Sequence, residues 1–192
     1  MIKPVGAIVL AAGFSSRFGS NKLLAHLSNG KSVFQQTVER IVEAFPKRLI
    51  VTRPEMVAQL QTLAQGTSIL SFDHSAQGMG ATLAFAVRQI GDWDGCVVCL
   101  GDMPFIEAST YRCITAQTTP DSIVTPVFNS QMGNPVAFGK NLFTDLGALT
   151  GNKGGRKLID MHPSAVRKLQ VSDPGILQDI DTLEELALYQ DS

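Results

Sequence analysis

Short apolar segments alternate with amphipathic segments along most of this sequence, and this alternation limits the choice of fold more than any other feature. The segments Val5–Leu10 and Gly95–Leu100 are almost entirely apolar, which is typical of strands covered on both faces. Other segments, such as 32–44, carry apolar residues at helical spacing. Strands and helices joined by short connections predict a three-layer α/β/α fold, doubly wound around a mainly parallel, Rossmann-like sheet.

The same patterns give approximate bounds for the predicted elements. Two helices are expected to begin at capping boxes, Ser32 with Gln35 and Thr182 with Glu185. The predicted helices are 32–44, 55–64, 81–90, 107–116, 140–149, 156–161 and 182–189. The predicted strands are 5–10, 48–51, 68–72, 95–100, 122–128, 135–138 and 166–171. The length of 192 residues suits one domain, so we expect a single domain over 1–192.

Charge and hydropathy argue against two classes of partner. The net charge is −1, so no overall field attracts nucleic acid or an anionic membrane. No apolar run approaches the ~20 residues of a membrane-spanning helix, and the start of the sequence has no signal-peptide layout. We therefore expect a cytoplasmic protein that binds neither nucleic acid nor membrane. Any phosphate binding must come from locally placed cations and backbone dipoles.

The three cysteines, Cys96, Cys99 and Cys113, do not suggest a disulfide framework, because their number is odd. Cys96 and Cys99 have the spacing of a redox or metal motif, but they lie inside the predicted strand 95–100. Side chains three residues apart on a strand point to opposite faces, so this pair cannot close on one metal ion. We expect buried structural thiols.

The first predicted strand leads directly into a loop of small and cationic residues, and the stretch Leu10–Leu24 has the sequence LAAGFSSRFGSNKLL. Glycines such as Gly13 and Gly19 let backbone N–H groups approach a ligand closely. Arg17 can hold phosphate oxygens with two parallel hydrogen bonds, while Lys22 is a compact charge. The spacing matches neither a P-loop nor the dinucleotide-binding glycine pattern. The alternative is a strand-to-helix turn with incidental charges, but the combination favours a polyphosphate-binding loop.

Two further loops leave predicted strands, Ser75–Ala81 and Gly101–Pro104. In parallel sheets, ligands bind beyond the carboxyl ends of the strands, so we expect both loops to converge with the first one. A lone aspartate after a strand, such as Asp102, is often only a turn or cap residue. Beside a phosphate-binding loop it is also a credible ligand for Mg²⁺, which prefers carboxylate and phosphate oxygens.

The loop pattern L-A-A-G-x-S-x-R-x-G-x-x-K-L-L resembles the signature of the MobA-like nucleotidyltransferases. Its A-A-G form is similar to the molybdenum cofactor cytidylyltransferase branch, whereas guanylyltransferases usually carry A-G-G. The resemblance covers essentially the whole chain and implies a nucleotide-diphospho-sugar-transferase-like fold. The other motifs follow in family order: Gly78-Met79-Gly80-Ala81, Gly101-Asp102-Met103-Pro104, Gly133-Asn134-Pro135-Val136, Leu149-Thr150-Gly151 and Asp179-Ile180-Asp181-Thr182.

Catalytic roles for Lys22, Arg17 and Asp102 are implied by this resemblance. Lys22 would stabilise the charge that develops around the α-phosphate of a nucleotide. Arg17 and the amides of Ala11–Gly13 would hold the departing pyrophosphate. Such phosphoryl chemistry depends on positioning and charge neutralisation more than on a protein base.

The resemblance also implies a Mg²⁺ cofactor held by aspartates. Asp102 is the first expected ligand, Asp179 is the better second candidate, and Asp181 is the runner-up. Asp179 and Asp181 lie on the same side if their segment is extended. Thr182 is a plausible N-cap of the last predicted helix, so a capping role remains the alternative for part of this motif.

Substrate contacts are implied in two groups. For the nucleotide they are Leu10, Ala11, Ala12, Gly13, Arg17, Lys22, Gly78, Met79, Gly80 and Ala81. For the acceptor they are Asn134, Pro135, Gly151 and Gly154. For the segment Gly78–Gly80 the resemblance implies backbone contact with the base or ribose, because glycines permit close approach; a simple flexible connection is the alternative. Asn134 stands where many cytidylyltransferases have histidine, which leaves the acceptor open. The basic loop Leu149–Lys157 opens a predicted helix and is a candidate for the acceptor's phosphate, with a solvated turn as its alternative.

These implications lead to one expected reaction and two alternatives. The expected enzyme joins CTP to the terminal phosphate of molybdopterin, which forms the molybdopterin cytosine dinucleotide cofactor and releases pyrophosphate. The first alternative is a related enzyme that uses GTP or another acceptor such as a sugar phosphate. The second is a non-catalytic carrier of molybdenum cofactor. The expected partners are a nucleoside triphosphate and a molybdopterin-type acceptor, with transient contact to a molybdoenzyme or to cofactor-synthesis proteins.

Overall fold

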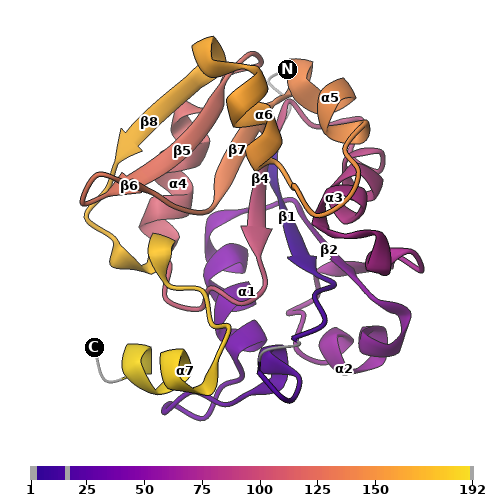
Figure 1. The fold of residues 1–192 in the computed structure, drawn as a ribbon, viewed down its shortest axis with the longest axis vertical. Coiled ribbons are helices and arrows are strands. Elements are labelled where there is room, and N and C mark those ends of the chain that lie inside the picture. Colours follow the sequence, from indigo (N-terminus) through magenta and orange to yellow (C-terminus); the bar gives the residue numbers. More distant parts are fainter. Residues whose placement is uncertain (1–3, 16–17, 191–192) are drawn as a thin grey trace.

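The computed structural model describes residues 4–15 and 18–190, and in them an eight-stranded sheet runs through the molecule (Figure 1). The strand order is β3-β2-β1-β4-β7-β5-β6, and β8 also pairs with β5. The strands are β1 Val5–Ala11, β2 Arg48–Thr52, β3 Ser68–Ser71, β4 Gly95–Leu100, β5 Ile123–Phe128, β6 Gln131–Met132, β7 Val136–Gly139 and β8 Val166–Gln170.

Parallel pairing organises the half of the sheet that precedes β5. β1 is parallel to both β2 and β4, and β2 is parallel to β3. β8 is also parallel to β5, whereas β7 is antiparallel to β4 and β5. The prediction of a mainly parallel, doubly wound sheet is therefore confirmed. The carboxyl ends of β1, β2 and β4 lie at one edge, and the loops that leave them meet there.

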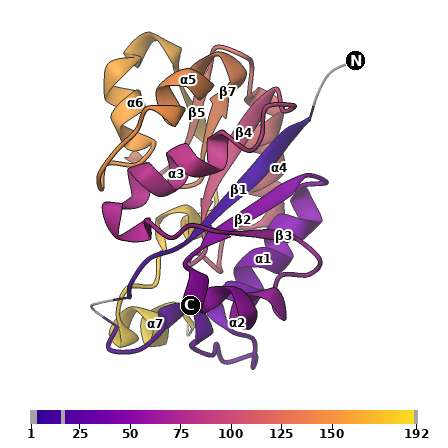
Figure 2. The same ribbon diagram turned by 90° about the vertical axis from the view of Figure 1, so that its right-hand side faces the viewer.

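Helices cover both faces of the sheet, as Figure 2 shows, and β1 supplies side chains to each layer. Ala7 and Val9 belong to the apolar cluster that includes α1 and α4. Ile8 and Leu10 belong to the opposite cluster, which includes α3, α5 and α6. The helices are α1 Val33–Ala44, α2 Val57–Gln61, α3 Met79–Val87, α4 Ala108–Gln117, α5 Phe143–Gly147, α6 Arg156–Met161 and α7 Leu183–Gln190.

Three helices differ from their predicted bounds by more than one residue, for local reasons. The predicted helix 55–64 begins as a 3₁₀ turn, Pro54–Met56, and its α-helical part, α2, ends at Gln61. The predicted helix 140–149 likewise begins as a 3₁₀ turn, and α5 ends at Gly147. α3 starts two residues earlier than predicted, because Gly78 takes a φ of 101° and lets the chain turn directly into the helix. No described helix is long and apolar enough to cross a membrane.

The two predicted capping boxes form to different extents. At α1, Ser32 Oγ accepts a hydrogen bond from Gln35 N, but the Gln35 side chain donates to Glu39 instead of returning to the cap. At α7, Glu185 N donates to Thr182 Oγ1 and Thr182 N donates to Glu185 Oε2, which completes the box. The box with glutamine thus forms only one of its two reciprocal hydrogen bonds, whereas the box with glutamate forms both.

The cysteines lie as predicted. Cys96 packs in the cluster with α3, and Cys99 packs in the cluster with α1, so their side chains lie on opposite faces of β4. Both are buried, and burial raises the pKa of each thiol. Cys113 is an exposed free thiol on α4. These positions confirm the interpretation of Cys96 and Cys99 as structural thiols.

Candidate active site

The loops that leave β1 and β4 line a cavity of about 510 Å³, called the first cavity below. Its walls also include the start of α3 and the segment before α7. The predicted nucleotide contacts found in its lining are Leu10, Ala11, Ala12, Gly13, Lys22, Gly78 and Met79. All three predicted metal ligands, Asp102, Asp179 and Asp181, line it as well. The predicted convergence of loops at this edge of the sheet therefore brings these residues together, whereas Arg17 lies outside the described residues.

Lys22 is the centre of the charged group in this cavity. Its Nζ lies 2.5 Å from Asp102 Oδ2 and 2.5 Å from Asp181 Oδ1, and the three side chains are only 11%, 16% and 20% exposed. Asn21 sets the start of the 3₁₀ turn Lys22–Leu24, because its side chain accepts a hydrogen bond from Leu23 N. Burial lowers the pKa of the Lys22 ammonium, but the attraction of the two carboxylates outweighs burial and raises it. Lys22 is therefore held in its charged form.

The carboxylates outnumber the ammonium in this cluster. Burial raises the pKa of Asp179, and the nearby charges of Asp102 and Asp181 raise it further, against a smaller lowering by a backbone hydrogen bond and by Lys22. Asp102 Oδ1 is buried and has no hydrogen-bond partner. A buried carboxylate oxygen without a partner is costly, and oxygen donors are the ligands that hard divalent cations prefer. The donor atoms of this cluster are therefore of the kind that a divalent cation prefers.

In the described part of the chain, no group of three His, Cys, Asp or Glu side chains is already arranged to hold a metal ion. Asp102 and Asp181 instead share the ammonium of Lys22. A cation bound between these two carboxylates would thus require Lys22 Nζ to move away from them. The same movement would free the ammonium for a phosphate group.

The segment that carries Asp179 and Asp181 crosses the end of β4 (Figure 1, yellow). Ile180 N donates a hydrogen bond to the carbonyl oxygen of Asp102. This backbone link joins two parts of the chain that the sequence separates widely. It explains why the two aspartate motifs meet in one cluster.

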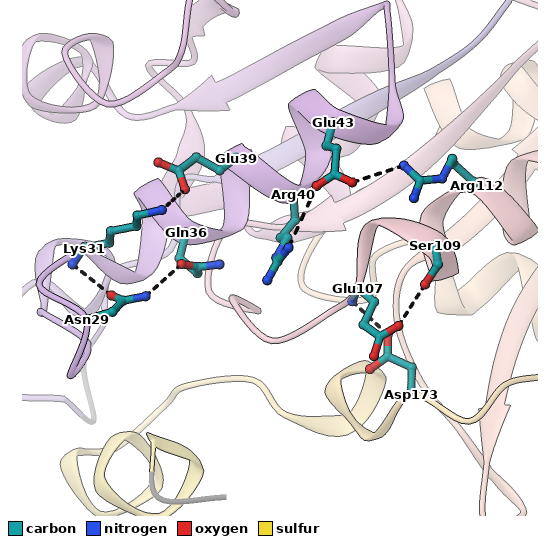
Figure 3. A network of polar contacts seen from close by, with 10 residues as sticks. All are labelled: Asn29, Lys31, Gln36, Glu39, Arg40, Glu43, Glu107, Ser109, Arg112 and Asp173. Atoms are coloured by element: carbon teal, nitrogen blue, oxygen red, sulfur yellow. Dashed lines mark hydrogen bonds and ion pairs between the residues drawn. The ribbon is translucent and has the colours of Figure 1, made fainter.

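Asp173 anchors that segment, and sequence reasoning missed it. Its carboxylate is 4% exposed and accepts hydrogen bonds from Glu107 N, Thr110 Oγ1 and Gly175 N. Figure 3 shows Asp173 against the start of α4, apart from the polar network on the surface of α1. The Asp-Pro-Gly sequence at 173–175 is a turn signal, but nothing in it indicates a carboxylate buried against a distant helix.

The predicted glycine motif before α3 has a structural role that neither sequence interpretation included. Gly78 lies where a Cβ would collide with the backbone of Gly151, and Gly80 lies where a Cβ would come 2.8 Å from Thr150 O. Gly80 N also donates to Gly151 O at 2.7 Å. Both glycines therefore permit close packing of two loops. Gly80 and Ala81 are not in the lining of the first cavity, whereas Gly78 is.

A second cavity, of about 450 Å³, adjoins the first and shares Met79, Leu100 and Asn152 with it. Of the four predicted acceptor contacts, Asn134 and Gly154 line this second cavity. Pro135 and Gly151 are not part of its lining, although each is next in sequence to a residue that is, Asn134 and Asn152 respectively. Its apolar wall includes Val98, Met132, Val136, Phe138 and Ile159, and its basic side chains are Lys153, Arg156 and Lys157.

Several lining residues were not among the predicted contacts. In the first cavity these are Phe14, Ser15, Leu23, Ser75, Thr82, Leu100 and Asn152. Phe14 and Ser15 lie within the predicted phosphate loop, and Asn152 lies within the predicted basic loop. Their position in these loops is the sequence signal that could have identified them as lining residues. Thr82 faces the cavity from α3, and its position depends on where that helix begins.

The family model of the MobA-like NTP transferase domain matches residues 7–167. The chain belongs to this family. It is therefore a nucleotidyltransferase, with nucleotides among its small-molecule substrates. It is 26% identical over 190 residues to the purine catabolism protein PucB of Bacillus subtilis, with 93% of this chain and 92% of PucB covered. It is 28% identical over 144 residues to the bifunctional protein GlmU of Sphingopyxis alaskensis, which covers 73% of this chain but only 32% of GlmU.

Solved structures with a similar fold cover nearly the whole chain. Rv0371c from Mycobacterium tuberculosis H37Rv has a TM-score of 0.88 and 26% identity, with 100% of both chains covered. A structure of Rv0371c in complex with manganese has a TM-score of 0.82 and 25% identity, with 98% of this chain and 99% of that one covered.

Proposed function

We propose that this protein transfers the cytidylyl group of CTP to the phosphate of a molybdopterin-type acceptor and releases pyrophosphate. The observation that carries the proposal is the Lys22–Asp102–Asp181 cluster, which lies in a cavity that shares a wall with a second, apolar and basic-rimmed one. Two adjoining cavities suit two substrates that must react with each other. The Ala11-Ala12-Gly13 sequence, which resembles the cytidylyl branch, favours CTP.

In this mechanism the first cavity binds the nucleoside triphosphate and the second binds the acceptor. The acceptor phosphate attacks the α-phosphorus in line, the bond to the β-phosphate oxygen breaks, and pyrophosphate leaves. The Lys22 ammonium neutralises charge at the α-phosphate, and the backbone of Ala11–Gly13 with Arg17 holds the pyrophosphate. Preorganised donors of this kind are a large source of rate enhancement in phosphoryl transfer.

Mg²⁺ is the proposed cofactor, held by Asp102 together with Asp179 or Asp181. The partnerless Asp102 Oδ1 supports this site, and the manganese complex of Rv0371c supports a divalent cation as the cofactor. When bound, the ion would neutralise phosphate oxygens. The basic side chains Lys153, Arg156 and Lys157 at the second cavity suit the phosphate of an acceptor, and the apolar wall suits its ring system.

Ligand-induced stabilisation tests the choice of nucleotide. The purified protein is heated with CTP, GTP, ATP or UTP in the presence of Mg²⁺. A ligand at 100 times its Kd adds about 2.7 kcal/mol to the free energy of unfolding, so CTP should raise Tm most. Stabilisation by GTP alone would overturn the cytidylyl assignment.

Pyrophosphate release tests turnover. A reaction of the protein with CTP, Mg²⁺ and molybdopterin should release pyrophosphate in step with loss of CTP. Binding of both substrates without pyrophosphate would support a carrier of the cofactor instead. Turnover with a sugar phosphate but not with molybdopterin would move the protein to the other enzymatic alternative.

A further inference from the structure

The segment that follows β2 contacts both ends of the loop 11–22, in which the proposed function places the pyrophosphate. Thr52 Oγ1 donates a hydrogen bond to Ala11 O at 2.8 Å, where β1 ends and this loop begins. Near the end of the loop, Asn21 Nδ2 donates to Met56 Sδ. Met56 is 4% exposed and belongs to the apolar cluster that includes α1 and α4. Both contacts therefore connect the loop to buried parts of the fold.

Arg53 contacts the middle of the same loop through an aromatic ring. Its guanidinium carbon lies 4.5 Å from the centre of the Phe14 ring. The Arg53 side chain is 13% exposed, and its Nε is buried without a hydrogen bond, with Glu55 Oε1 as an ion-pair partner at 3.4 Å. Long cationic side chains normally keep their charged end in water, whereas the attraction between a cation and a ring strengthens as water is removed. The contact therefore fixes the position of a ring that is 55% exposed.

Ser15, the next residue after that ring, has a backbone conformation that depends on its surroundings. Its φ of 52° lies in the left-handed region, which residues other than glycine adopt rarely and keep only where neighbouring contacts impose it. Its carbonyl oxygen accepts a hydrogen bond from Phe18 N, which closes a turn. The contact between Phe14 and Arg53 is directly adjacent to this turn, and it reaches the loop from a different strand.

Arg53 acts on the loop from outside the cavity. The lining of the first cavity includes Gly13, Phe14 and Ser15, but it does not include Arg53. This position disfavours a direct contact between the guanidinium and a phosphate in the cavity. Donors that are in place before the reaction contribute most to catalysis, and small displacements of a bound group are costly. A side chain that fixes the loop from behind can thus influence phosphate binding without touching the phosphate.

We propose that Arg53 is a positioning residue that acts through the Phe14 ring and holds the loop 11–22 in the conformation that binds the β- and γ-phosphates of the nucleotide. Thr52 and Met56 hold the two ends of the same loop. This inference deepens the proposed function and rests on it, because it takes the ligand to be a nucleoside triphosphate with its pyrophosphate part at this loop. Loss of Arg53 should therefore weaken binding of those two phosphates and not of the rest of the nucleotide.

Two nucleotides isolate this part of the binding. CTP and CMP share the base, the ribose and the α-phosphate, and they differ only in the two phosphates that the loop is proposed to bind. With Mg²⁺ present, calorimetry gives the Kd of CTP, and displacement of CTP gives that of CMP, for the wild type, Arg53→Ala and Phe14→Ala. Each variant should weaken CTP binding at least about fivefold, the size of a cation–π contact, and change CMP binding less than about twofold. Equal losses for both nucleotides, or unchanged binding of CTP, would overturn the proposal.

Coupling between the two side chains tests whether Arg53 acts through the ring. Arg53→Ala should add little to the loss of CTP binding in the Phe14→Ala background, because the contact is already absent there. Phe14→Tyr keeps the aromatic face and should bind CTP more tightly than Phe14→Leu, which keeps only an apolar side chain. Fully additive losses would mean that the Arg53 charge acts on the phosphates by itself. That result, or equal binding by Phe14→Tyr and Phe14→Leu, would overturn the positioning role.

Arg88→Ala is the matched control, since Arg88 is an exposed arginine that donates to Gly147 O on another part of the surface. It should leave both Kd values unchanged. Thermal unfolding of each variant without nucleotide separates loss of the fold from loss of loop position: a lower Tm with wild-type CTP binding would make the contact purely structural and overturn the proposal. If the wild type binds no nucleoside triphosphate, the proposed function fails; if it binds CTP and Arg53→Ala binds CTP equally well, only this inference fails.

Discussion

Lys22 lies between two carboxylates in the structure, and in the proposed reaction it neutralises a phosphate. Replacing it by methionine keeps the apolar stem and removes only the charge. We expect Lys22→Met to lower kcat/KM by on the order of 10²-fold or more, because stabilisation of the developing charge is lost. Pyrophosphate release under saturating Mg²⁺ measures the effect. Lys31→Met, which removes another ion-paired lysine away from the site, is the control, and a wild-type rate in Lys22→Met would refute the catalytic role.

Asp102 has one oxygen on Lys22 and one buried oxygen without a partner. Asp102→Asn keeps the shape of the side chain but removes its charge. We expect the Mg²⁺ concentration for half-maximal activity to rise at least about tenfold, since changes even to the neighbours of metal ligands cost that much. A Mg²⁺ titration of the variant measures this, and a curve that superimposes on the wild type would exclude Asp102 as a ligand.

These two residues could be singled out from the sequence because each follows a strand at the edge where ligands bind. Their pairing with Asp181 could not, because it joins Lys22 to a residue 159 positions away. Local patterns carry no information about contacts at such separation. The Phe14–Arg53 pair was missed for a similar reason, since it depends on β1 and β2 being neighbours.

At the scale of elements, Asp173 joins the start of α4 to the segment that precedes α7. Its carboxylate accepts three hydrogen bonds, two of which are buried. Asp173→Asn replaces one accepting oxygen with a donor, so at least one N–H or O–H loses its partner. We expect a loss of about 2 kcal/mol in the free energy of unfolding. Urea denaturation measures it, with the exposed Asp160→Asn as the control, and equal midpoints for the two variants would show that Asp173 is not an anchor.

Strands were easier to predict than helices in this chain. The apolar run of β4 is continuous, and its predicted bounds agree with the structure. The short helices α2 and α5 begin as 3₁₀ turns and end early, which residue spacing does not reveal. The antiparallel direction of β7 between β4 and β5 was not predictable either, because alternation of apolar residues is the same in both directions.

At the scale of the whole molecule, the meeting of loops at one edge followed from the doubly wound pattern alone. The sequence pattern did not indicate that the C-terminal segment returns across the edge of the sheet where these loops meet. Backbone hydrogen bonds from Asn134 N to Ile176 O and from Ile180 N to Asp102 O close this part of the fold. Such backbone contacts are independent of side-chain type, so no residue pattern records them. The two adjoining cavities share Met79 and Asn152, which lie where Gly78 and Gly80 pack against the 150–152 loop.

The two cavities make the two substrates independently testable. Arg156 and Lys157 line the second cavity but not the first, so their charges should serve the acceptor's phosphate and not the triphosphate. We expect the Arg156→Gln, Lys157→Gln double variant to raise KM for the acceptor about tenfold or more, the equivalent of one lost charged hydrogen bond, while KM for CTP stays within about twofold.

Lys47→Gln is the matched control for this double variant, because Lys47 pairs with Asp92 and precedes β2, at the opposite end of that strand from the site. Initial rates of pyrophosphate release, with each substrate varied in turn, give both KM values. Because a general loss of structure would raise both values together, only a selective change supports two cavities with separate substrates. An increase in KM for CTP as large as that for the acceptor would mean that the triphosphate extends into the second cavity. The two cavities could then no longer be assigned to separate substrates.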